Sequence, residues 1–246
     1  MRPRAGWAAV RPAHRGPLLV ALAAAGVYVV GLSSLPPALL MLVKPLPVAI
    51  LAWLVFIERP DVYGRRTVAG LVLSAVGDAL LVTDAHFLAG LAAFLVAHLA
   101  YTFAFLSDER RLRAERALPF VVWLLAARLY LQPNLYGMSG PVTVYMLAIG
   151  VMMWRAAARV GRKGAPTPAE WSALAGAALF GLSDTILAIN RFRVPLPRAD
   201  DLVILLYWAG QYGIARSALD EPSPEWRRPM VNPGTIGGAP GSRRSS

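Results

Sequence analysis

Long apolar runs, separated by short segments that hold most of the arginines, dominate this 246-residue sequence. A helix needs about 20 consecutive apolar residues to cross the hydrocarbon core of a bilayer. With 57% apolar and 16% charged residues, the chain is also more apolar than a soluble domain, which has about 45–50% and about 25%. The sequence therefore predicts an all-α fold, a polytopic membrane protein with a bundle of eight transmembrane helices. The eight runs, of which the fifth and sixth are the shortest, are residues 17–35, 38–57, 66–83, 86–106, 117–131, 140–154, 169–190 and 200–218.

The basic residues predict the orientation of these spans, because short cytoplasmic loops collect Lys and Arg. With the N-terminus inside, 20 of the 25 basic residues fall on the cytoplasmic side, and the outer loops hold only Arg191, Arg193 and Arg198. We therefore expect both termini in the cytoplasm. The basic clusters flank apolar runs and lack the interleaved aromatic residues of a nucleic-acid groove. The net charge of +11 thus does not indicate a nucleic-acid partner.

The sequence divides into three parts. Residues 1–16 are expected to form a basic cytoplasmic arm, residues 17–219 the transmembrane domain, and residues 220–246 a disordered cytoplasmic tail rich in Pro, Gly, Arg and Ser. The first run also fits a signal peptide, but its length and its continuation into further spans favour an uncleaved helix. The 23 Arg against 2 Lys are typical of a GC-rich bacterial genome, so we expect a bacterial plasma membrane.

The third and seventh runs resemble each other. The same offset of 106 residues relates all the matched pairs, and four runs separate the two copies, so both copies run in the same direction. This pattern indicates a possible parallel 4+4 repeat of the kind found in transporters, although small residues beside a functional Asp can also recur without duplication. The pairs are Gly70 and Gly176, Asp78 and Asp184, Leu81 and Leu187, and Tyr101 and Tyr207.

Charged and ionisable residues inside the predicted spans are the most informative feature for function, because each charge costs roughly 2.5–3.5 kcal/mol to insert. Five such residues occur, and counting along the spans places His98 near the middle and the others in the outer half: Lys44, Asp78, His98, Arg128 and Asp184. We expect them to share one largely apolar chamber that suits an amphiphilic ligand. Structural alternatives are an ion pair at Lys44, a helix-to-helix hydrogen bond at His98, and an Arg128 side chain that reaches the outer interface.

Metal and thiol chemistry are not expected. The sequence has no Cys, which excludes disulfides, thiolate metal sites and cysteine nucleophiles. Its three His are too far apart in sequence for a two-histidine metal motif. No metal and no cofactor are therefore predicted.

Several motifs in order along the chain resemble the YhhN-like lysoplasmalogenase family. The resemblance covers residues 38–218 and depends on the order and spacing of the motifs together. The motifs are Lys44-Pro45, Gly77-Asp78, the series Phe87, Gly90, Phe94, His98 and Tyr101, the segment Leu179-Phe180 with Ser183-Asp184 and Leu187-Ala188, and the pair Tyr207 and Gln211.

This resemblance implies a membrane hydrolase that cleaves the vinyl ether bond of lysoplasmalogens to a fatty aldehyde and glycerophosphocholine or glycerophosphoethanolamine. Asp78 and Asp184 match the paired acidic positions of the family and are the expected catalytic residues, dividing general acid and base roles between them. Lys44 is expected to receive the lipid phosphate or, as we favour, to tune the pKa of the Asp it faces. The further residues expected to bind substrate or to tune a pKa are His98, Tyr101, Ser183, Asn190, Tyr207 and Gln211. The sequence gives no indication of the oligomeric state.

Three other classes of function remain open from the sequence. A proton-coupled transporter of small molecules or lipids would also place Asp, His and Lys in its core. A non-catalytic lipid-binding or scaffold protein is a further alternative. An intramembrane aspartyl protease is disfavoured, because Ala75 stands where its Gly-x-Gly-Asp signature has the first glycine.

Overall fold

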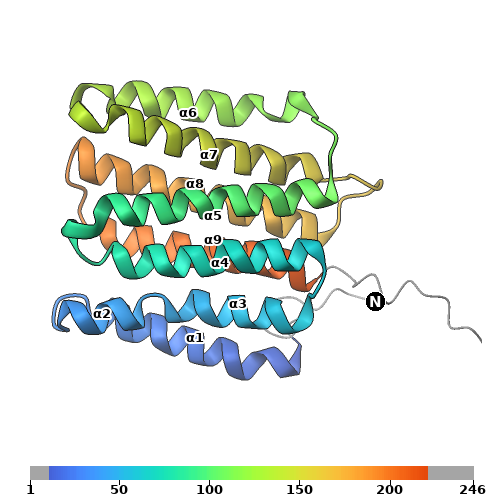
Figure 1. The fold of residues 1–246 in the computed structure, drawn as a ribbon, viewed down its shortest axis with the longest axis horizontal. Helices are drawn as coiled ribbons and strands as arrows, with labels where there is room; N and C mark the ends of the chain where they lie inside the picture. Colours follow the sequence, from blue (N-terminus) through green and yellow to red (C-terminus); the bar gives the residue numbers. More distant parts are fainter. Residues whose placement is uncertain (1–10, 221–246) are drawn as a thin grey trace, which may run out of the picture.

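The computed structural model describes residues 11–220, and the regular elements within them are all helices. The long helices lie side by side along one axis and form a single bundle (Figure 1). The predicted all-α class is therefore confirmed. The helices are α1 (Pro12–Gly31), α2 (Pro37–Val43), α3 (Leu46–Glu58), α4 (Val62–Leu80), α5 (Phe87–Asp108), α6 (Leu118–Leu131), α7 (Ser139–Arg159), α8 (Pro168–Phe192) and α9 (Ala199–Leu219), joined in places by short 3₁₀ turns.

Within residues 11–220, five helical segments are long and apolar enough to cross a membrane, which indicates a membrane protein with several spans. They are Pro12–Gly31, Pro37–Glu58, Asp84–Asp108, Tyr136–Arg159 and Pro168–Phe192. The remaining helices are shorter or more polar. α6 has 14 residues, α4 carries Arg65, Arg66 and Asp78, and α9 carries two Asp in its first turn and Arg216 in its last.

Two helix boundaries differ from those expected. α1 begins at Pro12, inside the segment predicted to be the basic arm, whose residues 1–10 lie outside the described part of the chain, as do residues 221–246 of the predicted tail. α7 continues to Arg159, so the prediction of a short sixth run is wrong. Arg155 and Arg159 extend this helix because both side chains are buried and bonded within the protein.

The second apolar run, expected as one span, is interrupted at Lys44-Pro45. α2 ends at Val43, α3 begins at Leu46, and the Lys44 N–H still bonds to the Leu40 carbonyl oxygen at 2.9 Å. Pro45 has no N–H to continue the helical ladder. Lys44 thus lies at the junction of α2 and α3, where its side chain lines a cavity.

The two helices that carry Asp78 and Asp184 both begin at capped N-termini. Asp61 caps α4 by accepting a 2.8 Å hydrogen bond from the Gly64 N–H. Thr167 and Glu170 form a capping box at the start of α8, in which each side chain accepts from the backbone N–H of the other residue. These caps satisfy N–H groups that the helix leaves unpaired, and they fix the start of each helix.

α8 and α9 approach each other closely because glycines line their contact. A Cβ added at Gly176 would lie 2.6 Å from the Gly210 carbonyl oxygen, and one at Gly213 would lie 2.8 Å from the Gly176 Cα. Farther along the same contact, the Ser183 hydroxyl donates to the Val203 carbonyl oxygen at 2.8 Å. The α8–α9 and α4–α5 pairs are the most extensively packed in the bundle, and all four helices contribute to the site.

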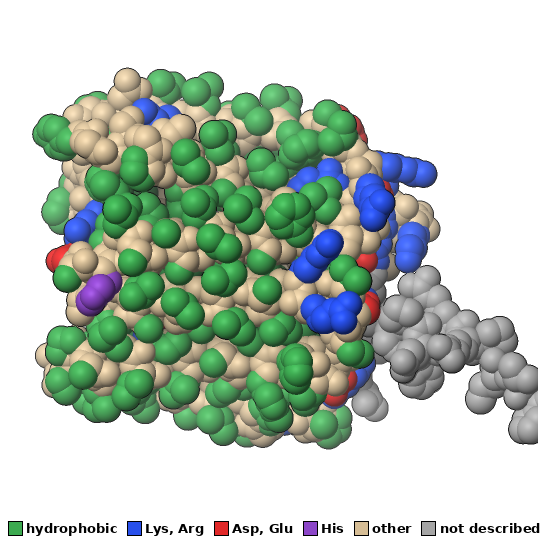
Figure 2. Space-filling model, in the orientation of Figure 1, with side chains coloured by type: hydrophobic (Ala, Val, Ile, Leu, Met, Phe, Trp, Pro, Cys, Tyr) green, Lys and Arg blue, Asp and Glu red, His purple; other side chains and the backbone are tan. Residues whose placement is uncertain are grey.

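Basic residues gather at one end of the bundle, which we call the arginine end (Figure 2). Several of them are buried rather than solvated: Arg155 donates to the Arg111 and Leu112 carbonyls, and Arg159 donates to the Tyr63 hydroxyl at 2.8 Å and to Asp108 at 2.6 Å. The described ends of the chain also meet here, because the Arg11 side chain bonds to Glu58 in α3 and to the Leu219 carbonyl of α9.

Candidate functional site

The first predicted catalytic carboxylate, Asp78, lies near the end of α4 and is 1% exposed. Its Oδ2 accepts a 2.7 Å hydrogen bond from the Tyr207 hydroxyl of α9. The resemblance predicted Tyr207 as a site residue, and the structure places it against Asp78. A short bond from a phenol orients the carboxylate and stabilises its negative charge.

The second predicted catalytic carboxylate, Asp184 of α8, has an analogous partner. Its Oδ2 accepts a 2.6 Å hydrogen bond from the Tyr145 hydroxyl of α7, and its side chain is 14% exposed. Tyr145 was not predicted, because it stands in an apolar run without a charged neighbour. The one sequence signal for it is a tyrosine inside such a run, since a tyrosine hydroxyl buried there needs a hydrogen-bond partner.

His98 of α5 lies beside Asp184 and is fully buried. Its Nε2 is 3.8 Å from the Asp184 Oδ2, which is beyond hydrogen-bond distance. Within residues 11–220, neither ring nitrogen of His98 has a hydrogen-bond partner. The ring is held by packing instead, with its centroid 5.1 Å from that of Tyr145 and 4.8 Å from that of Phe180.

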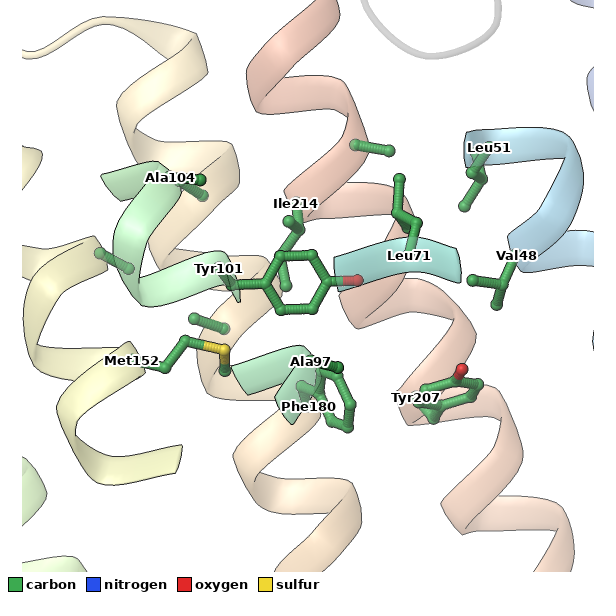
Figure 3. Close-up of a cluster of buried hydrophobic side chains, with 14 of the residues drawn as sticks. Val48, Leu51, Leu71, Ala97, Tyr101, Ala104, Met152, Phe180, Tyr207 and Ile214 are labelled. Carbon is green, nitrogen blue, oxygen red and sulfur yellow. The ribbon is translucent and has the colours of Figure 1, made fainter. Parts of the chain in front are cut away.

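An aromatic cluster lies behind the two carboxylates. Phe94 packs edge-to-face against Phe180 and Tyr207 with centroid distances of 5.9 and 5.6 Å, and Phe180 lies 5.2 Å from Tyr207. Figure 3 shows Phe180 and Tyr207 beside Tyr101 in the buried core of the bundle. These contacts fix the Tyr207 hydroxyl relative to Asp78 at small entropic cost, because an aromatic side chain has only two side-chain torsions.

Both carboxylates line one cavity of about 340 Å³, which we call the polar chamber. It lies away from the arginine end, between α1, α2, α4, α5, α8 and α9. Six of the nine predicted site residues line it: Lys44, Asp78, Ser183, Asp184, Asn190 and Tyr207. Of the five ionisable residues expected to share one chamber, Lys44, Asp78 and Asp184 line it, whereas His98 and Arg128 do not.

Lys44 faces the polar chamber together with Asp78 and Asp200. Its ammonium lies 5.9 Å from the centroid of the Tyr28 ring. It makes no ion pair or hydrogen bond with the other described residues. The favoured role of Lys44 as a partner of an Asp is therefore not supported by a direct contact.

A second cavity, which we call the apolar slot, runs between α5, α6, α7 and α8. Asp184 lines it as well as the polar chamber. Most of its walls are aliphatic or aromatic, including Leu91, Leu124, Ile149, Met153 and Ala188. Asp184 is thus the carboxylate that stands where a polar and an apolar space meet.

The other predicted residues lie outside the polar chamber. The Tyr101 hydroxyl donates to Gln211 Oε1 at 2.7 Å and lies 3.4 Å from the Ser74 hydroxyl, in a buried polar group nearer the arginine end. Figure 3 shows Tyr101 pointing from α5 toward Leu71 of α4. Arg128 also does not reach the chamber, since its guanidinium bonds to Thr143, Ser139 and Gln132 where α6 turns into α7.

Ser183 and Asn190, which line the chamber, also make hydrogen bonds that hold α8, α9 and the turn between them together. The Ser183 hydroxyl is used in the α8–α9 contact described above. Asn190 Oδ1 accepts a 2.8 Å bond from the Leu196 N–H and so shapes the turn between α8 and α9. Within the described residues, no group of three or more His, Asp or Glu side chains is arranged to hold a metal ion.

A helical bundle with several apolar helices and two tyrosine-bonded carboxylates on one chamber is typical of multi-span membrane proteins that carry ionisable groups in their core. Comparison with known proteins gives the family. The chain belongs to the YhhN family, whose model matches residues 39–218, and the resemblance drawn from the motifs is confirmed.

Several curated relatives of the chain are named lysoplasmalogenase. The human protein named lysoplasmalogenase TMEM86B is 38% identical over 189 residues, which cover 75% of this chain and 77% of the relative. Human lysoplasmalogenase TMEM86A is 35% identical over 214 residues, covering 81% and 87%. A protein of Mycobacterium bovis named lysoplasmalogenase is 32% identical over 155 residues, covering 59% and 56%. No solved structure matches the chain.

Proposed function

We propose that this protein is a lysoplasmalogenase, a membrane hydrolase that cleaves the vinyl ether bond of a lysoplasmalogen to a fatty aldehyde and a glycerophospho-base. The names of the relatives support the substrate class. The observation that carries the proposal is the position of Asp184 at the junction of the polar chamber and the apolar slot. In a lysoplasmalogen, the vinyl ether likewise lies between the polar head and the hydrocarbon chain.

The reaction requires acid and base chemistry and no nucleophilic side chain. A carboxylic acid transfers a proton to the alkene carbon farther from the ether oxygen, which leaves an oxocarbenium ion. Water adds to the cationic carbon and loses a proton to a carboxylate, giving a hemiacetal. The hemiacetal then collapses: its carbon-to-glycerol-oxygen bond breaks, its hydroxyl proton is released, and the glycerol oxygen is protonated. This division of labour is the one that paired carboxyl groups perform in glycosidases.

We assign the acid role to Asp184 and the base role to Asp78. Asp184 faces both spaces and can therefore meet the reacting double bond, while Tyr145 holds one of its oxygens and leaves the other free. Asp78 lies in the polar chamber with Lys44, whose charge compensates a carboxylate. In the collapse step, Asp184 takes the hemiacetal proton and Asp78 returns one to the glycerol oxygen, so both residues regain their starting states.

Lys44 is proposed to receive the substrate phosphate. It faces the polar chamber and has no ion pair within the described residues, so its charge is available to an anion. An ammonium binds phosphate as a point charge. His98 is proposed to influence the charge state of Asp184, whose Oδ2 lies 3.8 Å from the His98 Nε2. Tyr101 and Gln211 are proposed to hold the aromatic cluster in place.

We further propose eight membrane crossings with both termini in the cytoplasm of a bacterial cell. Two observations support this arrangement: most basic residues lie at the arginine end, and the described ends of the chain meet there. The two closely packed pairs, α4–α5 and α8–α9, are those that a 4+4 repeat would relate. Reporter fusions after Asp84 and after Ser107 are expected to report opposite sides of the membrane, and a shared side would refute this topology.

The direct test is release of long-chain aldehyde, measured by mass spectrometry, from lysoplasmenylcholine and lysoplasmenylethanolamine incubated with purified protein. We expect aldehyde from the wild type and almost none from Asp184→Asn. No aldehyde from either lipid would refute the proposal. The transporter alternative predicts substrate flux into proteoliposomes without product, so the same samples separate the two functions.

A further inference from the structure

The walls of the apolar slot are almost entirely hydrocarbon, although the partly buried carboxyl of Asp184 lines it. Besides Asp184, three of its lining residues carry polar groups, and each of these groups is already bonded. Tyr145 donates to Asp184. The Thr185 hydroxyl donates to the Gly181 carbonyl at 2.7 Å and accepts from the Trp123 indole. Arg191 bonds to Asp84 at 2.6 Å.

Between Asp184 and Ala188, a ligand segment therefore finds one free hydrogen-bonding group, the Asp184 carboxyl, and otherwise only hydrocarbon. The Arg191 guanidinium, which has further N–H donors, lines the slot beyond Ala188. Any polar group placed deeper would be buried without a partner, which is strongly unfavourable. The slot thus selects for a segment that is apolar throughout and has its reactive group at the junction. Met146 and Met153 in its wall are unbranched and can adjust to a flexible chain.

The position of Asp184 along the slot divides it unequally. On α8 the slot extends from Gly181 to Phe192. At 1.5 Å per residue, Asp184 lies about 4.5 Å from the first of these residues and about 12 Å from the second. The longer part passes Ala188 and ends among Leu131, Val142 and Phe192, which belong to a separate hydrophobic cluster.

On this basis, and given the proposed function, we propose that the apolar slot is the binding subsite for the hydrocarbon chain of the substrate, with the chain running from Asp184 past Ala188 toward Phe192. The polar chamber then holds the glycerophospho-head. Ala188, one helical turn beyond Asp184, determines how much of the chain can enter, because a larger side chain there narrows the slot about 6 Å from the reacting bond.

The first test compares chain lengths in Ala188→Phe. The kcat/KM for a lysoplasmenylcholine with a hexadecenyl chain is expected to fall at least about tenfold relative to that for a butenyl chain, because pockets discriminate strongly by the volume they exclude. The matched control is Ala175→Phe on the same helix, whose side chain is exposed and lines neither cavity. It is expected to keep the wild-type ratio. Equal losses for both chain lengths in Ala188→Phe, or the same ratio as in the control, would overturn the inference.

The second test needs neither turnover nor a folded variant. A lysolipid with a saturated ether chain, which cannot be hydrolysed by this route, carries a diazirine at the chain end and is photolysed on wild-type protein in nanodiscs. Labelled peptides are expected from α6 and α7, which line the slot, and labels on α1, α2 or α9 would refute it. If the slot is labelled but the protein releases no aldehyde, the subsite is supported and the proposed reaction is refuted. If the protein releases aldehyde but the labels lie outside the slot, the reaction is supported and the subsite is refuted.

Discussion

Removing the hydroxyl of Tyr145 is the sharpest perturbation of the site. Tyr145→Phe keeps the ring that packs 5.1 Å from His98 and deletes the donor that lies 2.6 Å from Asp184 Oδ2. A hydrogen bond to a charged group contributes about 1.5–3 kcal/mol. Asp184 becomes a carboxylate only after it has given up its proton, so this bond strengthens in the transition state. At about 1.36 kcal/mol per tenfold change in rate, we expect kcat to fall about 10- to 150-fold.

The assay is aldehyde release at varied lysoplasmenylcholine concentration in nanodiscs, so that kcat and KM are obtained separately. KM is expected to change less than about threefold, because Tyr145 holds the acid and not the lipid head, and such a split marks an interaction made in the transition state. Tyr130→Phe is the matched control, since Tyr130 is exposed and its hydroxyl has no hydrogen bond to a described residue. Unchanged kcat, or a loss confined to KM, would refute the role of Tyr145 in positioning Asp184.

Three further outcomes are expected. Asp78→Asn and Asp184→Asn should each abolish most aldehyde release without lowering Tm, and the double variant should lose little more, because the two residues act as one unit; additive losses would contradict this. Lys44→Met should raise KM about tenfold for lysolipids and change kcat less, whereas an altered pH optimum at constant KM would identify an Asp-partner role. Arg159→Met should lower Tm by about 6–12 °C, because leaving Asp108 short of a buried partner costs about 3 kcal/mol; an unchanged Tm would show the pair to be dispensable.

The sequence sufficed for the helical class and for a chamber shared by Lys44, Asp78 and Asp184. Both depend on local properties, namely the length of the apolar runs and the cost of a charge in hydrocarbon. The partners of the aspartates depend on how neighbouring helices are rotated about their axes, which periodicity within one helix does not fix. For this reason the sequence predicts Tyr207 as a site residue but does not identify Asp78 as its partner, and it does not predict Tyr145 at all.

The same limit explains the errors at the arginine end. A hydropathy scale ends the apolar run before Arg155 and Arg159, because it scores each arginine as a charged residue regardless of the hydrogen bonds that it makes in the folded protein. In the folded chain, α5 and the segment that follows it supply carbonyl oxygens for one arginine and a carboxylate for the other. The two buried arginines thus belong to a helix that is longer than the apolar run that predicts it.

The shortness of α6 has a consequence for the lipid around the protein. Its 14 residues extend about 21 Å, whereas the hydrocarbon core of a bilayer is about 30 Å thick. With α6 as one of the eight proposed crossings, the mismatch favours local thinning of the bilayer along this helix. α6 also lines the apolar slot. A lysolipid that enters beside this helix would therefore have a shorter distance to descend to the slot than beside a helix that spans the full hydrocarbon core.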